Sequence, residues 1–357
     1  MKPRCLLDAE WKPSSHAPVQ LAALNQLLDA VWTGNLFYAR KWRSVGVTVT
    51  PLESLSDLAT LPFTTRTELI ADQSAAPPLG TNLTCEPSAL IRFHRSSGTT
   101  REPILWADSA ESWRWVMHGS ESLWRLADVR SSDRVLFLMP FGASSGPWII
   151  YEGACRLGCA CFPLGLVELE EQLRWLANFK PTVLAGKPSV LLALAEAVRA
   201  SGGRPAELGV NKLILCGSHD AALLTSLEQA WAAACFNRYG LTEAGSVAGE
   251  CTAHSGSLHL LDDGFIAESI DLDTGNPVTD SEPGELVLTT LGRTARPIIR
   301  YRTGDLVRLI RDHECACGRF GSFLLGGICR RTPTKRVPPA ATGCGENCPP
   351  LPTGSPA

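Results

Sequence analysis

Apolar and polar residues follow two different periods through the middle of the chain. Short apolar runs recur between residues 133 and 240, and longer segments with helical spacing of their apolar positions separate them. This pattern predicts strands at 133–140, 159–164, 181–186, 211–217 and 235–240, and helices at 147–157, 167–179, 189–201 and 219–234. The alternation is typical of a parallel sheet with helices on both faces. Ligands of such sheets bind beyond the carboxyl ends of the strands, so the expected binding loops are 140–146, 186–188, 217–219 and 239–245.

The segments on either side of this region differ from it. Residues 19–43 carry leucines at helical spacing and predict one helix, and Thr65 is expected to cap a helix that begins at Arg66. From about residue 250, strand-like runs separated by turn residues predict an antiparallel β region; they are GSLHLL, FIAESIDLD, GELVLTT, RPIIRYR and DLVRLIR. We therefore predict an α/β fold, with parallel sheets flanked by helices plus an antiparallel β region.

This fold is expected to form one large domain over residues 1–325. Its α/β core would span about 85–245 and its β-rich part about 250–320. Residues 326–357 are rich in proline and glycine and almost lack aliphatic residues, so they are expected to be disordered.

Composition excludes some classes of function. The net charge of −3 gives no electrostatic reason to bind nucleic acid or an anionic membrane. No apolar stretch approaches a membrane span, and the N-terminus does not resemble a signal peptide. We interpret the chain as a soluble, cytoplasmic protein, in which thirteen cysteines are not a disulfide framework. Cys155, Cys159 and Cys161 are expected to be buried as small hydrophobic residues.

Three short motifs could carry chemistry. RSSGTTREP, at 95–103, is a loop of hydroxyls and glycine that lets backbone N–H groups approach a phosphate, although a plain polar turn is the alternative. RYGLTEAG, at 238–245, follows a predicted parallel strand and offers a ring, a hydroxyl and a carboxylate; it could equally be an ordinary strand-to-loop turn. RYRTGDL, at 300–306, places Asp305 after a glycine turn, where it could bind ribose hydroxyls or serve only the turn geometry.

The order SSGTT, YGLTE, YRTGD is similar to the signature of adenylate-forming enzymes, which include acyl-CoA synthetases, adenylation domains of peptide synthetases and luciferases. Five further segments resemble the phenylacetate–coenzyme A ligase branch of that superfamily; they are LPFTTRTEL, GSLHLLDDGFIAE, GELVLTTL, RPIIRYRTGDL and CACGR. The resemblance covers roughly residues 20–320. It implies ATP-dependent activation of a carboxylic acid to an acyl-adenylate, followed by transfer of the acyl group to coenzyme A.

The resemblance also implies roles for individual residues. Thr242 would contact the α-phosphate and Glu243 would hold Mg²⁺, and these are the expected catalytic residues. Tyr239 would stack on adenine, beside Gly240. The remaining nucleotide-binding residues would lie in the phosphate loop, the adenine pocket and the ribose site; they are Ser96, Ser97, Gly98, Thr99, Thr100, Gly217, Ser218 and Asp305. The loop 140–146 and the segment near Gly240 would help to form the acid pocket, and the Phe and small residues of the loop are compatible with an aryl acid.

A metal site is a further expectation. Cys251 and His259 lie across a predicted hairpin, and Cys315 and Cys317 form a C-x-C pair, so together they make a closed set typical of structural zinc. Members of the branch show a similar arrangement. Free or buried thiols are the alternative, and His254 is a competing ligand.

The chain departs from the family pattern at two places. Arg101 and Glu102 replace the usual glycine and lysine of the phosphate loop, and a carboxylate beside a triphosphate is unfavourable. After CACGR, the GRxDD hinge and the mobile C-terminal domain with its lysine are not recognisable. Arg330 takes the hinge arginine's place, and Thr332 and Pro333 replace the acids. The pattern resembles a frameshift or early stop, or a single-domain relative, and CoA transfer is then expected to be impaired.

Two other functions remain open from the sequence. The chain could bind a nucleotide or acyl group without ligase activity, or it could adenylate an acid and pass it to an acceptor other than CoA. A Rossmann oxidoreductase is disfavoured because no GxGxxG follows the first strand. Relatives are often homodimers, but the sequence shows no interface.

Overall fold

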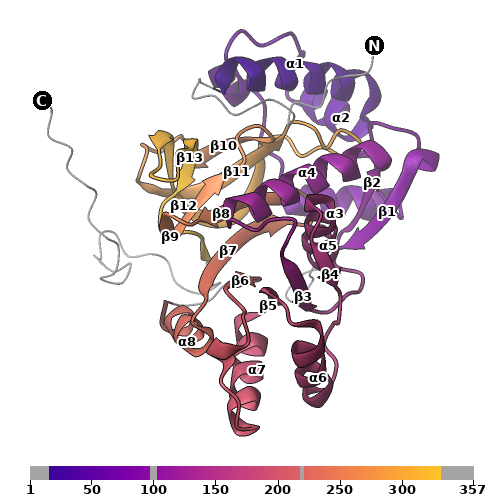
Figure 1. The fold of residues 1–357 in the computed structure, drawn as a ribbon. Helices are drawn as coiled ribbons and strands as arrows, with labels where there is room; N and C mark the ends of the chain where they lie inside the picture. The colour runs from indigo at the N-terminus through magenta and orange to yellow at the C-terminus, as the bar shows by residue number, and fades with distance from the viewer. Residues whose placement is uncertain (1–15, 97–102, 218–220, 331–357) are drawn as a thin grey trace, which may run out of the picture.

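The computed structural model describes residues 16–96, 103–217 and 221–330, and its architecture is α/β as predicted (Figure 1). The N-terminal part contains α1 (Ala17–Gly34), α2 (Leu36–Ser44), a short 3₁₀ turn (Leu55–Thr60) and α3 (Arg66–Ala75). A two-stranded antiparallel sheet follows, formed by β1 (Leu90–Arg95) and β2 (Leu105–Ser109). Thr65 caps α3 as expected, because its side chain accepts a hydrogen bond from the backbone N–H of Glu68.

The single helix predicted for residues 19–43 is wrong: it is broken at Asn35. The backbone of Asn35 is extended, with φ −111° and ψ 107°, and its side chain accepts from the N–H of Tyr38 to cap α2. The buried amide nitrogen of Asn35 also donates to Asn82 and Thr84, at 2.9 and 3.0 Å. Distant residues therefore impose a break that the leucine spacing does not reveal.

The main sheet has twelve strands within the described residues and combines a parallel and an antiparallel part. The parallel part has the order β4-β3-β5-β6-β7. Its strands are β3 (Arg134–Leu138), β4 (Ala160–Phe162), β5 (Val183–Gly186), β6 (Lys212–Leu215) and β7 (Ala234–Leu241). Its helices are α4 (Ala110–Leu126), α5 (Ser145–Leu157), α6 (Leu169–Phe179), α7 (Pro188–Ala200) and α8 (Ala221–Trp231). All nine elements predicted between 133 and 240 are present.

The antiparallel part continues the same sheet in the order β8-β9-β13-β12-β11-β10, with β14 paired to β12. Its strands are β8 (Gly245–Cys251), β9 (His254–Leu260), β10 (Phe265–Ile270), β11 (Pro283–Thr290), β12 (Tyr301–Glu314), β13 (Phe320–Leu324) and β14 (Cys329–Arg330). The runs RPIIRYR and DLVRLIR are not two strands: one strand, β12, begins at Tyr301. Residues just before it are held instead by buried arginines; Arg300 has a positive φ of 46° and its guanidinium pairs with Glu268 at 2.7 Å.

Strand β7 changes partners half-way along its length. Residues 234–237 pair in parallel with β6, and residues 238–241 pair antiparallel with β8. At the junction, the buried carboxylate of Glu250 accepts from the backbone N–H and the side-chain amide of Asn237, at 2.6 and 2.9 Å. The two parts of the sheet are thus joined through one strand, and the position of the domain boundaries remains a prediction.

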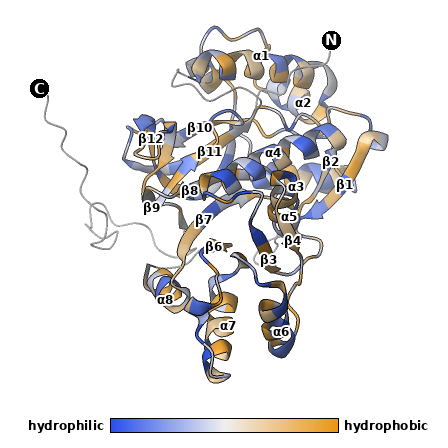
Figure 2. Ribbon diagram, viewed as in Figure 1, coloured by the Kyte–Doolittle hydropathy of each residue, from blue (hydrophilic) through white to orange (hydrophobic). Residues whose placement is uncertain are grey.

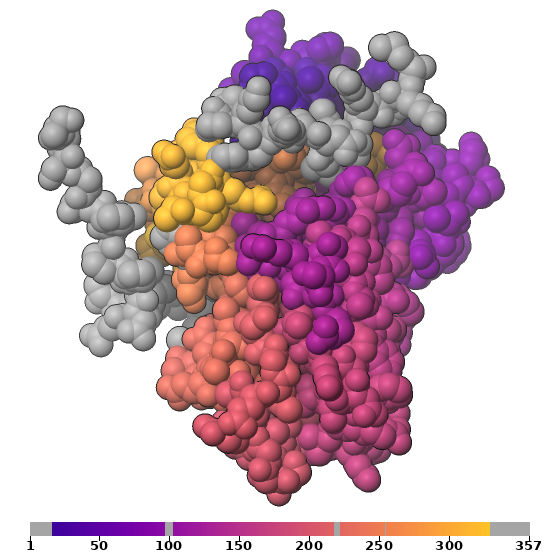
Figure 3. Space-filling view, viewed as in Figure 1, coloured from indigo at the N-terminus to yellow at the C-terminus, as the bar shows by residue number. Residues whose placement is uncertain are grey.

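Hydrophobic contacts hold the layers together. The parallel strands β3, β5 and β6 are nearly fully buried between helices that carry both hydrophobic and hydrophilic residues (Figure 2). The antiparallel strands pack against α1 and α2 through Leu24, Leu27 and Tyr38. In the space-filling view, α6–α8 form one end of the molecule and the N-terminal helices the other (Figure 3). None of the helices in the described part of the chain is long and apolar enough to cross a membrane.

The cysteines expected to be buried behave differently from one another. Cys159 is buried, Cys161 is half-buried and Cys155 is exposed at the end of α5, so the expectation fails for Cys155. The reason is helical geometry: Gly153 and Ala154 take the buried face of α5, and Cys155 follows on the outer side. Most of the segment predicted to be disordered, residues 331–357, lies outside the described residues.

Candidate functional site

A cleft of about 330 Å³ lies beyond the carboxyl ends of β6 and β7, where the parallel sheet predicts a ligand site. Residues of α3, α5, β6, β7, the β7–β8 turn and β12 line it. Six of the predicted site residues are among them: Ser96, Gly217, Tyr239, Gly240, Thr242 and Glu243. Ser97, Gly98, Thr99, Thr100 and Ser218 lie outside the described residues, as do Arg101 and Glu102.

A charged group at one side of the cleft joins three distant segments. Arg66, at the start of α3, donates to the Glu243 carboxylate at 2.6 Å and to the Ser96 hydroxyl at 2.9 Å. Glu243 is buried and Arg66 is half-buried. Tyr301 lies beside this pair; burial, with a smaller contribution from the Glu243 carboxylate, raises the pKa of its phenol. The last described residue before the phosphate loop is therefore fixed to the turn that carries Glu243.

Thr242 is held between two neighbours on opposite sides. Its carbonyl accepts from Nη1 of Arg293 at 2.6 Å, and its hydroxyl lies 3.3 Å from the hydroxyl of Ser145 at the start of α5. Arg293 forms a bidentate pair with Asp108, at 2.7 and 2.6 Å, and both side chains are fully buried. The position of Thr242 therefore depends on an ion pair formed outside the cleft.

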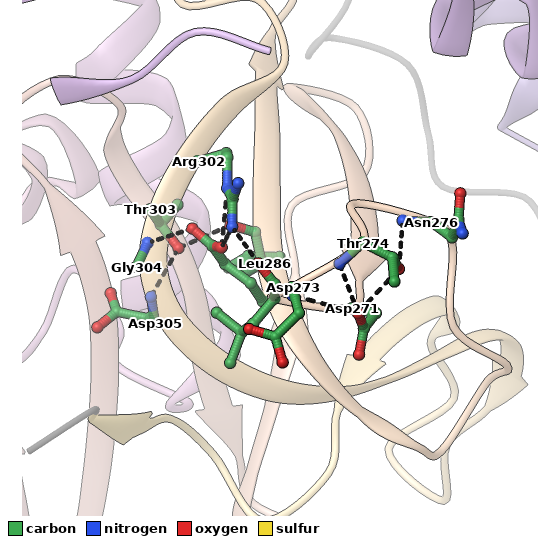
Figure 4. A network of polar contacts seen from close by, with 11 residues as sticks. Asp271, Asp273, Thr274, Asn276, Leu286, Arg302, Thr303, Gly304 and Asp305 are labelled. Atoms are coloured by element: carbon green, nitrogen blue, oxygen red, sulfur yellow. Dashed lines mark hydrogen bonds and ion pairs between the residues drawn. The ribbon is translucent and has the colours of Figure 1, made fainter. Parts of the chain in front are cut away.

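Tyr239 and Asp305, predicted to bind adenine and ribose, lie together. The Tyr239 hydroxyl donates to Oδ2 of Asp305 at 2.7 Å. Figure 4 shows how the turn before Asp305 is fixed: the Thr303 hydroxyl donates to the Leu286 carbonyl at 2.7 Å and accepts from the Asp305 N–H at 3.1 Å. In the same network Arg302 donates to Glu285 and to the Leu272 carbonyl. The Tyr239 ring and the Asp305 carboxylate are therefore held in position by contacts within the protein.

Two of the residues that line the cleft, Gly217 and Gly240, can only be glycine without a change in the backbone. Gly217 follows β6 with a φ of 98°, a conformation that other residues adopt only with strain. A Cβ on Gly240 would lie 2.5 Å from the Gly245 carbonyl oxygen across the turn. Any larger residue at 240 would push the β7–β8 turn, and with it Glu243, out of place.

The acid-pocket loop lies only partly where the sequence suggests. Ser144, Ser145 and Gly146 line the cleft, as do Ile149 and Ile150 of α5. Phe141 is not a lining residue: its ring packs edge-on against Trp148 and Tyr151, with centroids 5.1 and 5.8 Å apart. The apolar wall is therefore formed by aliphatic side chains rather than by the phenylalanine.

Comparison with known proteins places this geometry in a family. A family model described as AMP-binding enzyme matches residues 47–293, most of the chain. The chain belongs to this family. Phenylacetate–coenzyme A ligase of Pseudomonas putida is 31% identical over 327 residues, which are 90% of this chain and 73% of that protein. The Thermus thermophilus enzyme of the same name is 30% identical, over 84% of this chain and 67% of the relative.

A solved structure agrees with this membership in the AMP-binding family. A 2-hydroxyisobutyryl-CoA ligase, described in complex with 2-HIB-AMP and CoA, is 26% identical with a TM-score of 0.82, over 88% of this chain and 69% of the other. The expected membership of the phenylacetate–coenzyme A ligase branch and the expected fold are confirmed. The chain is therefore an enzyme of the acid–thiol ligase class.

This AMP-binding enzyme also brings the four predicted metal ligands together. The ligand atoms of Cys251, His259, Cys315 and Cys317 all lie within 4.8 Å of one another. The Sγ atoms of Cys251 and Cys315 are 3.7 Å apart, and Sγ of Cys317 is 3.3 Å from Nε2 of His259. Two sulfurs bound at about 2.3 Å to a tetrahedral zinc would be about 3.8 Å apart. The arrangement therefore fits zinc; the side chain of His254 lies outside what the structure describes.

Sequence reasoning missed several residues of the AMP-binding site. Arg66, Ser145, Arg238 and Tyr301 line the cleft, and Arg293 supports it from behind. LPFTTRTEL and RPIIRYRTGDL, both quoted for the family resemblance, contain Arg66 and Tyr301, so that resemblance is a signal for two of them. Ser145 lies in the expected binding loop 140–146 and Arg238 begins the motif RYGLTEAG, but neither was given a role. For Arg293 no local pattern marks one, because its partner Asp108 lies 185 residues away.

Proposed function

We propose that the chain activates a carboxylic acid with ATP and transfers the acyl group to the thiol of coenzyme A. A carboxylate oxygen attacks the α-phosphorus, the bond to the β-phosphate oxygen breaks, and pyrophosphate leaves. The thiol sulfur then attacks the acyl carbon, AMP leaves, and the thiol proton passes to solvent. The observation that carries this proposal is the single cleft in which Ser96, Tyr239, Thr242 and Glu243 lie together, in a chain of the AMP-binding family.

The residues of the cleft would mainly position and neutralise the reactants. Tyr239 would take the adenine ring, with Asp305 beside it for the ribose. The Thr242 hydroxyl would donate to an α-phosphate oxygen. Arg66 would add positive charge beside Ser96, at the entrance to the phosphate loop.

Mg²⁺ is the cation that this chemistry implies. Buried carboxylate oxygen is a ligand that Mg²⁺ accepts, so Glu243 fits the role together with phosphate oxygens of the nucleotide. The ion would supply neutralisation of phosphate charge. Because Arg66 already donates to Glu243, the guanidinium and the cation compete for the same carboxylate.

We propose that the acid is aryl and phenylacetate-like. Support comes from relatives named phenylacetate–coenzyme A ligase, at 30–31% identity, and from the apolar side chains of Ile149, Ile150 and Leu241 in the cleft. A benzene ring gains free energy against such a wall because both surfaces leave water.

Acid-dependent exchange of labelled pyrophosphate into ATP tests the adenylation step. We expect phenylacetate to support exchange, and Glu243→Gln to lower its rate by about 10²–10³-fold, the usual loss when one electrostatic stabiliser is removed. Glu207→Gln, which removes the carboxylate of an exposed ion pair with Arg204, is the control and should change little. ATP binding without exchange for any acid would instead identify a nucleotide-binding relative without ligase activity. A second assay then identifies the acceptor: it compares the rate of thioester formation with CoA with the rate of amide formation with amines.

We also propose that Cys251, His259, Cys315 and Cys317 bind a structural Zn²⁺. The set is closed and largely buried, so it would tie the β8–β9 hairpin to the segment before β13. Metal analysis of the purified chain should give about one zinc per chain, and Cys317→Ser should lose it and unfold at lower temperature. Cys85→Ser, at a half-buried cysteine outside the cluster, is the matched control. Absence of zinc, with no effect of a chelator on unfolding, would reject the site.

A further inference from the structure

Arg238 is a charged side chain in the wall of the cleft that the proposed mechanism does not use. It lies on β7, directly before Tyr239. Its Nη2 donates to the backbone carbonyl and the hydroxyl of Ser120 on α4, at 3.1 and 3.0 Å. The guanidinium carbon also lies 5.2 Å from the centroid of the Trp124 ring. Helix α4 therefore holds one side and one face of this guanidinium in place.

The other terminal nitrogen of Arg238 has nothing to bind. Nη1 is buried and has no hydrogen-bond partner within the described residues. The neighbouring ionisable group is the Cys216 thiol, whose pKa burial raises to about 11, so it carries no charge near neutral pH. Burial lowers the pKa of Arg238 to about 10, which still leaves the guanidinium protonated. Within the described residues, the guanidinium of Arg238 is thus not paired with a carboxylate, whereas Arg66 in the same cleft is paired with Glu243.

The three arginines that are buried in the described part of the chain are satisfied, whereas Arg238 is half-buried with a buried Nη1. Arg293 has Asp108, and Arg300 has Glu268. Arg296 donates to the carbonyls of Asn82, Leu105 and Leu79. A buried donor left unpaired destabilises the folded chain, and more strongly when it is charged. Arg238 therefore differs from its neighbours in a way that packing alone does not explain, and its free nitrogen belongs to a residue that lines the ligand cleft.

The position of Arg238 relative to Thr242 indicates which ligand it meets. Thr242 marks the reacting end of the acid in the proposed function, and it lies four residues after Arg238, past a bulge and at the start of a turn, so the two are at most about 13 Å apart along the chain. Ile149, Ile150 and Cys216 line the cleft together with them. An acid that places its carboxylate at Thr242 and its apolar body against Ile149 and Ile150 can direct its far end toward Arg238.

We propose that Arg238 binds an oxyanion at the far end of the acid, so that preferred substrates carry a second carboxylate rather than a wholly apolar tail. This inference rests on the proposed function and narrows its substrate class. A distal carboxylate would form a charge-assisted hydrogen bond with Nη1. A wholly apolar acid would instead leave this buried nitrogen unpaired. A site that binds a polar group of the substrate discriminates strongly against analogues that lack this group, because such an analogue leaves the buried partner in the protein unpaired.

Matched pairs of acids test the inference in the pyrophosphate exchange assay. We would compare phenylacetate with 4-carboxyphenylacetate, and butyrate with glutarate. The wild-type chain should prefer the dicarboxylate of each pair in kcat/KM by about 10²–10³-fold. Arg238→Met should abolish or invert this preference while the KM for ATP stays unchanged. Arg238→Lys, which keeps the charge, should retain part of it, and Arg125→Met, at an exposed arginine of α4, should retain all of it.

Several outcomes would overturn the inference. A wild-type preference for the monocarboxylates would do so even where Arg238→Met fails to fold. An equal loss for both members of a pair, or a raised KM for ATP, would assign Arg238 a structural or a nucleotide-binding role. If acids support pyrophosphate exchange but the two members of each pair are used equally well, the role of Arg238 is rejected and the proposed function stands. If ATP binds and no acid supports exchange, the proposed function fails and the inference falls with it.

Discussion

At the scale of single residues, the site depends on ion pairs that differ in depth. The pair of Arg66 with Glu243 borders the cleft, where water and ligand can reach the guanidinium. The pair of Arg293 with Asp108 is fully buried, and Arg293 also holds the carbonyl of Thr242. Removing one partner of a buried pair leaves the other charge uncompensated, which costs far more than breaking an exposed pair.

Asp108→Asn should therefore destabilise the chain strongly. We expect a loss of about 3–5 kcal/mol in the free energy of unfolding, measured by denaturant titration, because Arg293 stays buried without its carboxylate. Glu207→Gln removes an exposed carboxylate paired with Arg204 and should cost less than about 1 kcal/mol. Equal effects of the two substitutions would show that burial does not decide the strength of these pairs.

The sequence predicts some residues of the site better than others. Tyr239, Gly240, Thr242 and Glu243 are consecutive or nearly so, and a motif read along one loop finds them together. Arg66 meets Glu243 across 177 residues of sequence, and Arg293 meets Asp108 across 185. Only the fold brings such partners together, and the sequence of either segment alone contains no sign of the contact.

At the scale of elements, apolar strands were predictable and small-residue strands were not. The central parallel strands β3, β5 and β6 are rich in aliphatic residues and lie between helices, so their composition reveals them. Strand β8, GSVAGEC, is fully buried but consists mainly of small residues, so the predicted antiparallel region begins only after it, at about residue 250. The break at Asn35 was missed because it depends on contacts with Asn82 and Thr84.

Helix α1 offers a pH-dependent test of how elements are attached. His16 precedes α1 and lies 3.1 Å from Asp263 in the turn between β9 and β10, which raises the pKa of the imidazole to about 9. A raised folded-state pKa gives stability that is fully present below about 6.5, the unfolded value, and is lost as pH rises through about 9.

Comparing His16→Gln with wild type should show this loss. We expect the wild-type chain to be more stable by at most about 1 kcal/mol at pH 6, since Asp263 is half exposed, and the difference should vanish above pH 10. Melting temperatures at several pH values measure it. Gln20→Ala removes a contact between the same helix and the same turn without a titrating group, so its effect should not vary over this range. A pH-independent effect of His16→Gln would contradict the ion pair.

At the scale of the whole molecule, one sheet runs from β4 to β10 and carries the cleft near its middle. Residues of β6, β7 and β12 contact the cleft or the Tyr239–Asp305 pair, so a bound nucleotide would touch both parts of the sheet. Sequence reasoning predicted the two kinds of sheet but not their continuity, because hydrogen-bond pairing between distant strands leaves no local pattern.

Binding of AMP should consequently stabilise the whole chain. At a ligand concentration one hundred times Kd, we expect the free energy of unfolding to rise by about 2.7 kcal/mol in a single transition. Hydrogen exchange should slow in β6, in β7 and in β12 together. Two separate transitions, of which AMP shifts only one, would show that the parallel and antiparallel parts unfold independently.

The partner change along β7 has a mechanical consequence. A hinge needs a few residues whose backbone angles are free to change, yet residues 234–237 are bonded to β6, residues 238–241 to β8, and Glu250 clamps Asn237 at the junction. The two parts of the sheet cannot rotate about this strand without breaking those bonds. We therefore expect the sheet around the cleft to stay rigid when ligands bind and leave. Side chains and loops, not the sheet, would move to accommodate ligands of different size.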